Sequence, residues 1–208
     1  MTDALTCHIV RNWIRKTAEV MAENRAYLTE LDSAIGDADH GNNMDRGYKA
    51  VIEKLPDGDD VGALLKAVSM ALISKVGGAA GPLYGTMFLQ ASKPLMGKSE
   101  IGFEELAQFF DDAVAGVKMR GKADVGMKTM LDALVPAAEA FRAAGNVSDG
   151  LEAAVAAAEN GMKETIPMIA TKGRASYLGE RSRDHQDPGA TSSYLIIKAL
   201  RDAASEAA

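Results

Sequence analysis

The sequence predicts an all-α protein, an eight-helix antiparallel barrel or bundle of amphipathic helices. The chain is rich in alanine and only 5% of its 208 residues are aromatic, a composition that favours helices over strands. Apolar residues recur at helical spacing, for example at Val61, Leu64, Val68 and Leu72. No stretch of four or more residues alternates apolar and polar side chains as a half-buried strand would.

Turn-forming residues divide the chain into eight expected helices joined mostly by short connections. Pro56-Asp57-Gly58 predicts a turn between the second and third helices. Gly145-Asn146 predicts a helix end, and Ser148 is a candidate cap for the next helix. Asp187-Pro188 is typical of a helix start. The expected helices span residues 3–28, 42–55, 60–76, 81–96, 103–120, 127–144, 148–170 and 188–205.

Two connections, Thr29–Gly41 and Thr171–Asp187, are expected to be long and polar. Long ordered loops on a compact helical scaffold often carry function, so candidate site residues are sought there first. The chain has no internal repeat, low-complexity linker or long charge block, and residues 1–208 are therefore expected to form one domain.

Composition argues against several classes of function. Asp and Glu outnumber Lys and Arg by 29 to 23, and a formal net charge of −6 argues against duplex nucleic acid as the main partner. No apolar run approaches the roughly 20 residues that span a membrane, and Met1 to Trp13 lack the pattern of a signal peptide. The single cysteine, Cys7, excludes an internal disulfide and fits a reducing compartment. We expect a cytoplasmic protein without nucleic-acid or membrane partners.

The first loop carries three aspartates, Asp32, Asp37 and Asp39, among glycines that permit a tight turn around a common centre. Ionised carboxylates repel one another unless cations lie between them, and oxygen ligands favour Mg²⁺ or Ca²⁺ over zinc. An EF-hand is excluded because its sixth and twelfth positions, counted from Asp37, would be Asn42 and Tyr48. The alternative interpretation is an acidic surface loop in which Asp32 or Asp39 caps a helix.

Two further segments are candidates for contact with phosphates, with which magnesium in proteins commonly shares its coordination. The glycine-rich segment Gly77–Gly85 precedes an expected helix, whose free N–H groups could bind an anion, although a plain helix–helix turn fits equally well. Lys172, Arg174, Arg181 and Arg183 concentrate positive charge in the second long loop. That charge fits phosphates or an acidic partner, and it also fits a solvated polar loop.

Four segments match one known family when they are taken together. They are Gly-Asp-Ala-Asp-His-Gly at 36–41, Gly-Gly-Ala-Ala-Gly-Pro-Leu-Tyr-Gly at 77–85, Lys-Thr-Met-Leu-Asp at 128–132, and Gly-Arg-Ala-Ser-Tyr-Leu-Gly-Glu-Arg with His-Gln-Asp-Pro-Gly-Ala between 173 and 190. In this combination and order the chain resembles, over almost its whole length, the DhaL family of nucleotide-binding subunits of dihydroxyacetone kinases. The first and last segments are highly specific.

The resemblance implies an eight-helix barrel that binds ADP or ATP at one end through two Mg²⁺ ions. By motif, the metal ligands correspond to Asp32, Asp37 and Asp39. The residues that match nucleotide contacts are His40, Gly41, Asn42 and Asn43 at the phosphates, Ala79 and Ala80 at the glycine turn, Gly121 and Met130 at the adenine end, and Arg174, Asp187, Pro188 and Gly189 in the covering loop.

The resemblance also implies phosphoryl transfer to dihydroxyacetone held by a separate subunit, DhaK, with no covalent nucleophile in this chain. In the phosphoenolpyruvate-dependent version the nucleotide stays bound as a coenzyme, and a phosphotransferase-system subunit, DhaM, rephosphorylates it. Two alternatives stay open. One is a subunit that exchanges ATP and serves dihydroxyacetone or another keto-sugar such as erythrulose. The other is a subunit that binds a transcriptional regulator. A homodimer is expected.

Two positions depart from the family pattern. Ala80 stands where many relatives carry serine, which removes a side-chain donor but leaves the backbone N–H. Met127 stands where the usual Gly-Asp-Lys-Thr motif has aspartate, which removes a charge near the expected adenine end. Neither position belongs to the three aspartates, so both changes bear on nucleotide retention rather than on metal binding.

Overall fold

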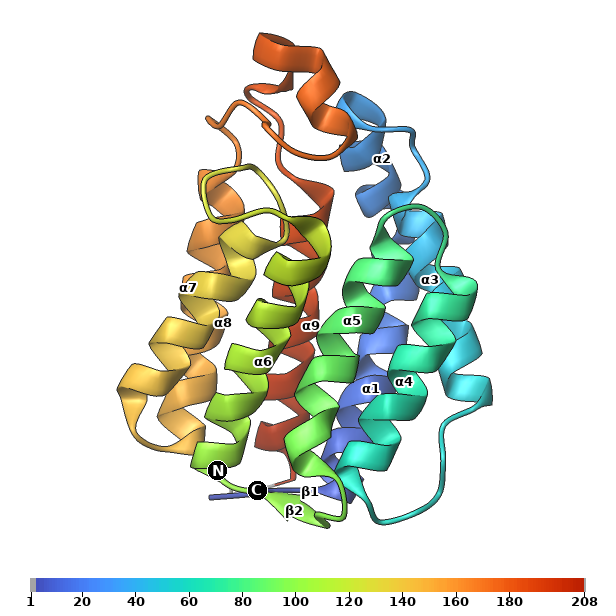
Figure 1. Ribbon diagram of the computed structural model, residues 1–208, viewed down its shortest axis with the longest axis vertical. Helices are drawn as coiled ribbons and strands as arrows, with labels where there is room; N and C mark the ends of the chain where they lie inside the picture. Colours follow the sequence, from blue (N-terminus) through green and yellow to red (C-terminus); the bar gives the residue numbers. More distant parts are fainter. Residues whose placement is uncertain (1–2, 208) are drawn as a thin grey trace.

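The computed structural model describes residues 3–207 and consists almost entirely of helices (Figure 1). A pair of two-residue strands, β1 (Leu5–Thr6) and β2 (Glu100–Ile101), runs antiparallel and pairs Leu5 with Ile101. Two 3-10 helices are η1 (Lys93–Leu95) and η2 (Arg174–Ser182). The α-helices of the described part are α1 (Cys7–Glu23), α2 (Arg25–Ile35), α3 (His40–Glu53), α4 (Val61–Lys75), α5 (Ala80–Ser92), α6 (Phe103–Gly121), α7 (Leu131–Ala144), α8 (Val147–Glu164) and α9 (Pro188–Glu206).

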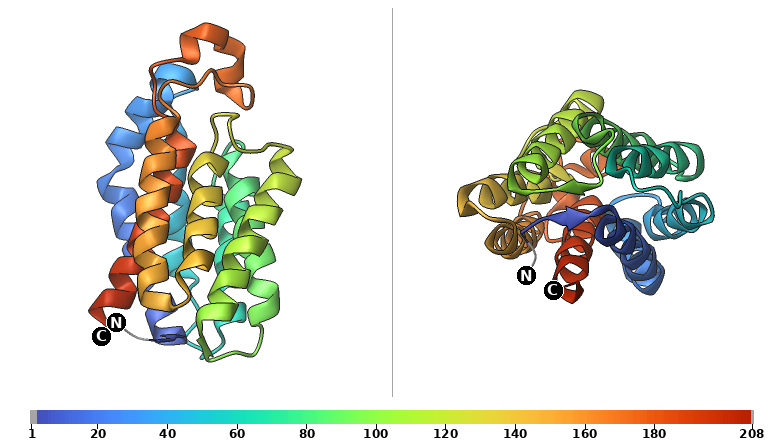
Figure 2. Two further views of the ribbon diagram at one scale, coloured as in Figure 1. Left: turned by 90° about the vertical axis from the view of Figure 1, so that its left-hand side faces the viewer. Right: turned by 90° about the horizontal axis from the view of Figure 1, so that it is seen from below.

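The helices form a closed ring in which chain neighbours pack side by side (Figure 2). Helices α3 to α9 follow one another around the ring, and α1 packs against both α9 and α3, which closes it. Helices α1 and α2 together make one bent rod, broken at Asn24, where ψ is 9°. The ring therefore has eight rods, and the expected all-α barrel is confirmed.

Apolar side chains fill the middle of the ring. Trp13 packs against Phe88 and Phe109, and its indole N–H donates to the carbonyl of Ile196 at 2.9 Å, which ties α1 to α9 across the closure of the ring. Phe110 packs on Phe141, which joins α6 to α7. Large buried residues of this kind dominate the free energy gained on burial, at about 25 cal/mol per Å² of apolar surface.

The expectation of one helix over 3–28 followed by a long loop is wrong. Residues 25–35 form α2, so the connection expected at Thr29–Gly41 shrinks to a turn of residues 36–39. The reason is that Leu28, Asp32 and Ile35 form a buried helical stripe in which one member is a carboxylate rather than an apolar residue. Helix α8 likewise ends at Glu164 instead of continuing to residue 170.

Most of the predicted helix ends are confirmed. Gly145 ends α7 with a φ of +80°, and the carboxylate of Asp187 accepts from the Ala190 N–H to cap α9. The cap of α8 is Asn146 rather than Ser148, because the Asn146 side chain accepts from the Asp149 N–H. Within residues 3–207, no helix combines the length and apolar character needed to cross a bilayer.

The up-and-down order of the rods determines what gathers at each end of the barrel. The lower end in Figure 1 holds the two strands and both chain termini. The upper end collects the first turns of α3, α5, α7 and α9 and the last turns of α2, α4, α6 and α8. Helix N-termini present unpaired N–H groups and a positive dipole end, so this end of the barrel favours anions.

We predict that Gly161→Ala destabilises the protein by about 1–3 kcal/mol, because a Cβ at Gly161 would lie 1.9 Å from the carbonyl oxygen of Asp132 and would separate α8 from α7. Elsewhere in a helix interior the same substitution would stabilise by about 1 kcal/mol. Urea unfolding followed by circular dichroism measures the difference. Gly58→Ala is the control, since a Cβ there meets no atom within 4 Å. Equal unfolding free energies for the two variants would contradict the prediction.

Candidate functional site

A cavity of about 500 Å³ opens at the upper end of the barrel. Each helix that starts at this end contributes to its wall, through His40 of α3, Ala80 of α5, Met130 before α7 and Pro188 of α9. Other parts of the wall come from the turn after α2 and from the loop between α8 and α9. A pocket of this size suits a ligand as large as a nucleotide, and the converging helix starts favour an anionic one.

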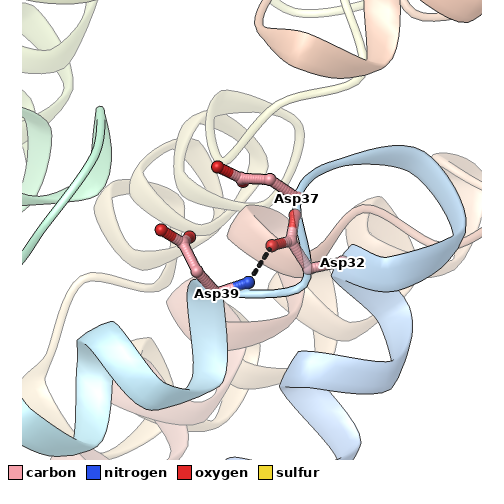
Figure 3. Close-up of side chains that lie close together, drawn as sticks. All are labelled: Asp32, Asp37 and Asp39. Carbon is pink, nitrogen blue, oxygen red and sulfur yellow. Dashed lines mark hydrogen bonds between the residues drawn. The ribbon is translucent and has the colours of Figure 1, made fainter.

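Asp32, Asp37 and Asp39 lie together at this cavity (Figure 3). One carboxylate oxygen of each lies within 4.8 Å of one from each of the others, a spacing that allows a cation to bind between them. Asp32 is buried, Asp37 is exposed and Asp39 is half-buried. Three carboxylates supply the hard oxygen ligands that Mg²⁺ prefers, and they leave coordination positions for phosphate oxygens and water.

Local backbone geometry holds the three carboxylates in this arrangement. Asp32 Oδ2 accepts from the backbone N–H groups of Asp39 and His40, at 2.8 and 3.1 Å, and so caps the start of α3. A Cβ at position 36 would lie 2.0 Å from Asp32 Oδ1, so only glycine leaves that carboxylate in place. Ala38 adopts a φ of +58°, which reverses the chain between Asp37 and Asp39. Asp32 is therefore both a helix cap and a candidate metal ligand.

The loop between α8 and α9 brings positive charge to the aspartates. Arg174 at the start of η2 pairs with Asp37 Oδ2 at 2.9 Å. A small apolar cluster of Ile35, Ala170 and Ala175, with Leu178 against it, packs this loop on the end of α2. Both groups of the ion pair are partly exposed, so water screens their attraction. Arg174 partly offsets the repulsion among the carboxylates and lies at the cavity, where it could also bind phosphate.

Beneath the cavity, a chain of hydroxyl groups holds His40. Its Nε2 lies 2.8 Å from Ser192 Oγ, which lies 2.7 Å from the hydroxyl of Tyr84. The Tyr84 hydroxyl also lies 3.0 Å from Ser193 Oγ and donates to the carbonyl of Gly189. Burial lowers the pKa of the His40 imidazole and raises that of Tyr84 to about 12. The lowered pKa favours the neutral form of the imidazole, whose Nε2 lies within hydrogen-bond distance of the Ser192 hydroxyl.

The glycine turn between α4 and α5 borders the same cavity as the aspartates. Gly77, Gly78, Ala79 and Ala80 all line the cavity, and Gly78 has a φ of +62°. A side chain at Gly77 would meet Asn43 Oδ1 at 2.8 Å, so the buried Asn43 packs directly behind the turn. The turn thus offers its backbone to a ligand at the start of α5, which matches an anion-binding helix N-terminus.

Apolar groups line another part of the wall, from Leu83 and Met130. Gly121, at the end of α6, lies behind this part, because a Cβ there would be 3.2 Å from Leu83 Cδ2. The backbone before α7 is shaped by Asp132, whose two carboxylate oxygens accept from the N–H groups of Gly126 and Thr129. An apolar wall beside a cationic and acidic one suits a ligand with an aromatic base and a charged tail.

The cavity brings together most of the residues predicted from sequence. Four of them do not line it: Gly41 packs against the backbone of α2, Asn42 lies in a separate hollow, Asn43 supports the glycine turn and Gly121 lies behind Leu83. Sequence reasoning missed Tyr84, Lys128 and Ser192, although Tyr84 and Lys128 fall inside matched motifs. The predicted residues on the wall are Asp32, Asp37, Asp39, His40, Ala79, Ala80, Met130, Arg174, Asp187, Pro188 and Gly189.

Comparisons with known proteins agree with this geometry. Residues 34–202 match the DAK2 domain. The chain is 48% identical, over 94% of its length and 96% of the relative, to the ADP-binding subunit DhaL of the PEP-dependent dihydroxyacetone kinase of Escherichia coli K12. It is 40% identical, over 94% of its length and 97% of the relative, to the ADP-binding subunit DhaL of the PTS-dependent dihydroxyacetone kinase of Lactococcus lactis.

A solved structure shares the fold. The dihydroxyacetone kinase of C. freundii, crystallised in complex with AMP-PNP and Mg²⁺, superposes with a TM-score of 0.72 at 26% sequence identity. The match covers 94% of this chain but 34% of that kinase, so the chain spans about a third of the larger enzyme.

We predict that Asp187→Asn changes how stability depends on pH in the protein without metal or nucleotide. Burial raises the pKa of Asp187 from 3.8 to about 7, so its contribution to the unfolding free energy is fully present below about pH 4 and is lost as the pH rises through 7. A difference of 1 between the folded-state and unfolded-state pKa corresponds to about 1.36 kcal/mol. Asparagine keeps a cap acceptor for the Ala190 N–H and does not ionise.

Urea unfolding at several pH values measures this effect. The wild type should lose stability relative to Asp187→Asn between pH 5 and 8. Parallel stability curves for the two proteins would show that Asp187 is already ionised in the folded state at pH 5.

Proposed function

This chain belongs to the DAK2-domain family, and we propose that it is the nucleotide-carrying subunit of a dihydroxyacetone kinase, with Mg²⁺-bound ADP or ATP as its coenzyme. The whole of residues 1–208 would act as one nucleotide-binding domain. The observation that carries the proposal is the meeting of three carboxylates within 4.8 Å at a cavity walled by four helix starts. The relatives named as ADP-binding subunits support the same ligand.

The donor set fits the proposed metal ions. Asp32, Asp37 and Asp39 offer oxygen ligands alone, which suits Mg²⁺. The clustered negative charge would repel a nucleotide polyphosphate without cations, so metal and nucleotide are expected to bind together. We propose two Mg²⁺ ions, because three aspartates carry a charge of −3 and two ions bring the site to a net positive charge.

We assign a proposed role in nucleotide binding to the residues of each part of the cavity wall. The bound Mg²⁺–nucleotide supplies the phosphoryl group and neutralises its oxygens. His40, Ala79 and Ala80 are proposed to donate hydrogen bonds to phosphates, and Gly41, Asn42 and Asn43 to shape that segment. Met130, with Gly121 behind the wall, would contact the base. Arg174 would cover the phosphates, with the α9 start formed by Asp187, Pro188 and Gly189. None of these residues needs to form a covalent intermediate, since positioning and charge neutralisation suffice.

The proposed partners follow from the relatives. Subunits named for PEP-dependent and PTS-dependent kinases imply a sugar-binding partner of DhaK type and a phosphocarrier of DhaM type. A cytoplasmic location fits such partners. Exchange of free ATP, with dihydroxyacetone or erythrulose as acceptor, is the second candidate function, and the larger ATP-analogue-binding kinase of C. freundii favours it. The proposal also includes formation of a homodimer, and binding of a transcriptional regulator is its alternative from another functional class.

We predict that Asp37→Asn lowers ADP affinity at least about tenfold in the presence of Mg²⁺, because it removes one charged metal ligand. Isothermal titration calorimetry with ADP measures the affinity, and circular dichroism checks that the helices persist. Asp57→Asn, an exposed aspartate near the opposite end, is the matched control and should bind ADP like the wild type. Unchanged affinity in Asp37→Asn would overturn the metal assignment.

A coupled assay with purified DhaK-type subunit and dihydroxyacetone separates the two candidate functions. If the nucleotide is a coenzyme, ADP stays bound through gel filtration, and phospho-DhaM supports repeated turnover, whereas free ATP does not, because it cannot displace the bound ADP. Steady turnover with free ATP and rapid loss of ADP would instead establish the exchangeable-nucleotide enzyme.

A further inference from the structure

Lys128, in the connection between α6 and α7, is one of the most deeply buried charged residues of the described chain, with 1% of its surface exposed. Its Nζ donates to the main-chain carbonyls of Thr165, Met168 and His185, at 2.7, 3.1 and 2.5 Å. The carbonyl of Ile166 lies farther away, at 3.4 Å. An ammonium has three N–H donors, so the three short contacts satisfy it completely.

These acceptors belong to the two ends of one loop. Thr165, Ile166 and Met168 follow the last turn of α8, and His185 precedes the first turn of α9. Between them, residues 169–184 carry η2 and rise above the upper end of the barrel (Figure 1), and residues 172–175 of this segment line the cavity. A single buried cation therefore joins the start of this loop to its end, and joins both to the segment before α7.

Neighbouring hydrogen bonds converge on the same junction. The N–H of Asp184 donates to the Ile166 carbonyl at 2.8 Å, and that of Asp187 donates to Thr165 Oγ1 at 3.0 Å. The N–H of Thr171 donates to the carbonyl of Met127, beside Lys128, at 3.3 Å. The loop ends are thus held by a small network whose only charged donor, among these contacts, is the ammonium of Lys128.

Charge and donor number explain why an ammonium suits this position. Three main-chain carbonyls direct their negative ends at one buried point, and an ammonium supplies three N–H donors and a positive charge from a single atom. Burial lowers the pKa of Lys128, whereas Asp187, Asp184 and Asp132 act in the opposite direction and favour the charged form. Removing the ammonium would leave buried carbonyls without a donor, which is costly.

We propose that Lys128 is a positioning residue of the nucleotide site, whose ammonium clamps together the two ends of loop 165–187 and so keeps the loop over the cavity. The loop carries Arg174 and leads into Asp187, Pro188 and Gly189, and Lys128 itself lines the cavity, so the clamp sits directly beside the proposed ligand. The link to nucleotide retention rests on the function proposed above. The clamp itself does not, because every contact is internal to the chain.

Two variants separate the charge of Lys128 from its bulk. Lys128→Met keeps an unbranched apolar stem and loses the ammonium. Lys128→Ala also removes the stem. Alanine keeps Cβ and loses Cγ, Cδ, Cε and Nζ, so the space that it leaves matches the three carbons and the nitrogen of propylammonium. Both variants share the positive φ of Lys128, so backbone strain changes little between them and the wild type.

Hydrogen exchange in the nucleotide-free protein tests the clamp alone. In Lys128→Met, the amides of Thr171, Asp184 and Asp187 should exchange at least about tenfold faster, because the two loop ends that carry them lose the ammonium that joins them. Amides of α6 near the lower end of the barrel should keep their wild-type rates. Unchanged exchange at the three loop amides would overturn the proposal, and so would an equal acceleration throughout the chain.

The rate at which bound ADP dissociates tests the consequence for the site. Lys128→Ala should release ADP at least about tenfold faster than the wild type, and added propylammonium should slow the release, since it restores N–H donors to the carbonyls. Tetramethylammonium, which has the same charge but no N–H, is the control and should have no effect. Wild-type ADP release in Lys128→Ala, or equal rescue by both cations, would overturn the role in retention.

These two measurements also distinguish a failure of the proposed clamp from a failure of the proposed function. Failure of the wild-type protein to bind ADP would overturn the proposed function, and the exchange experiment would still decide whether Lys128 holds the loop.

Discussion

The repulsion among Asp32, Asp37 and Asp39 is the constraint around which the upper end of the barrel is built. Three carboxylates with oxygens within 4.8 Å of one another are stable only where positive groups face them. The chain supplies two N–H groups to Asp32, a guanidinium to Asp37, and the positive dipole ends of four helices. The same groups that make the aspartates tolerable also make the cavity attractive to phosphate once metal ions are bound.

This arrangement depends on helices that approach one another unusually closely. A Cβ at Gly41 would lie 2.1 Å from the carbonyl oxygen of Arg25, and one at Gly81 would lie 2.4 Å from that of Val76. A Cβ at Gly161 would lie 1.9 Å from the carbonyl oxygen of Asp132 at the start of α7. All three glycines lie toward the end that carries the cavity. They let the helix ends draw together there.

Sequence predicted the parts of the site that depend on neighbours along the chain. The spacing of Asp32, Asp37 and Asp39 and the cap at Asp187 are local patterns with a direct physical cause. Lys128 and Ser192 were missed because their partners are distant in the sequence. Ser192 contacts His40, which is 152 residues away, and the acceptors of Lys128 lie 37 to 57 residues away. Helix α2 was missed because its buried face contains the carboxylate of Asp32. A search for apolar residues at helical spacing expects a carboxylate to be exposed, so it finds no buried stripe here.

The structure shows which groups Ala80 and Met127, the two departures from the family pattern, offer to their surroundings. Ala80 begins α5 at the cavity wall, where its backbone can face the ligand whatever its side chain. Met127 lies in a turn that is shaped mainly by Asp132, whose two oxygens bind the N–H groups of Gly126 and Thr129. Met127 adds a backbone carbonyl that accepts from the Thr171 N–H, and its thioether sulfur accepts from the Asp124 N–H at 3.3 Å. At position 80 the candidate site therefore offers a main-chain group, whereas at position 127 the methionine sulfur accepts an N–H that an aspartate carboxylate could also accept.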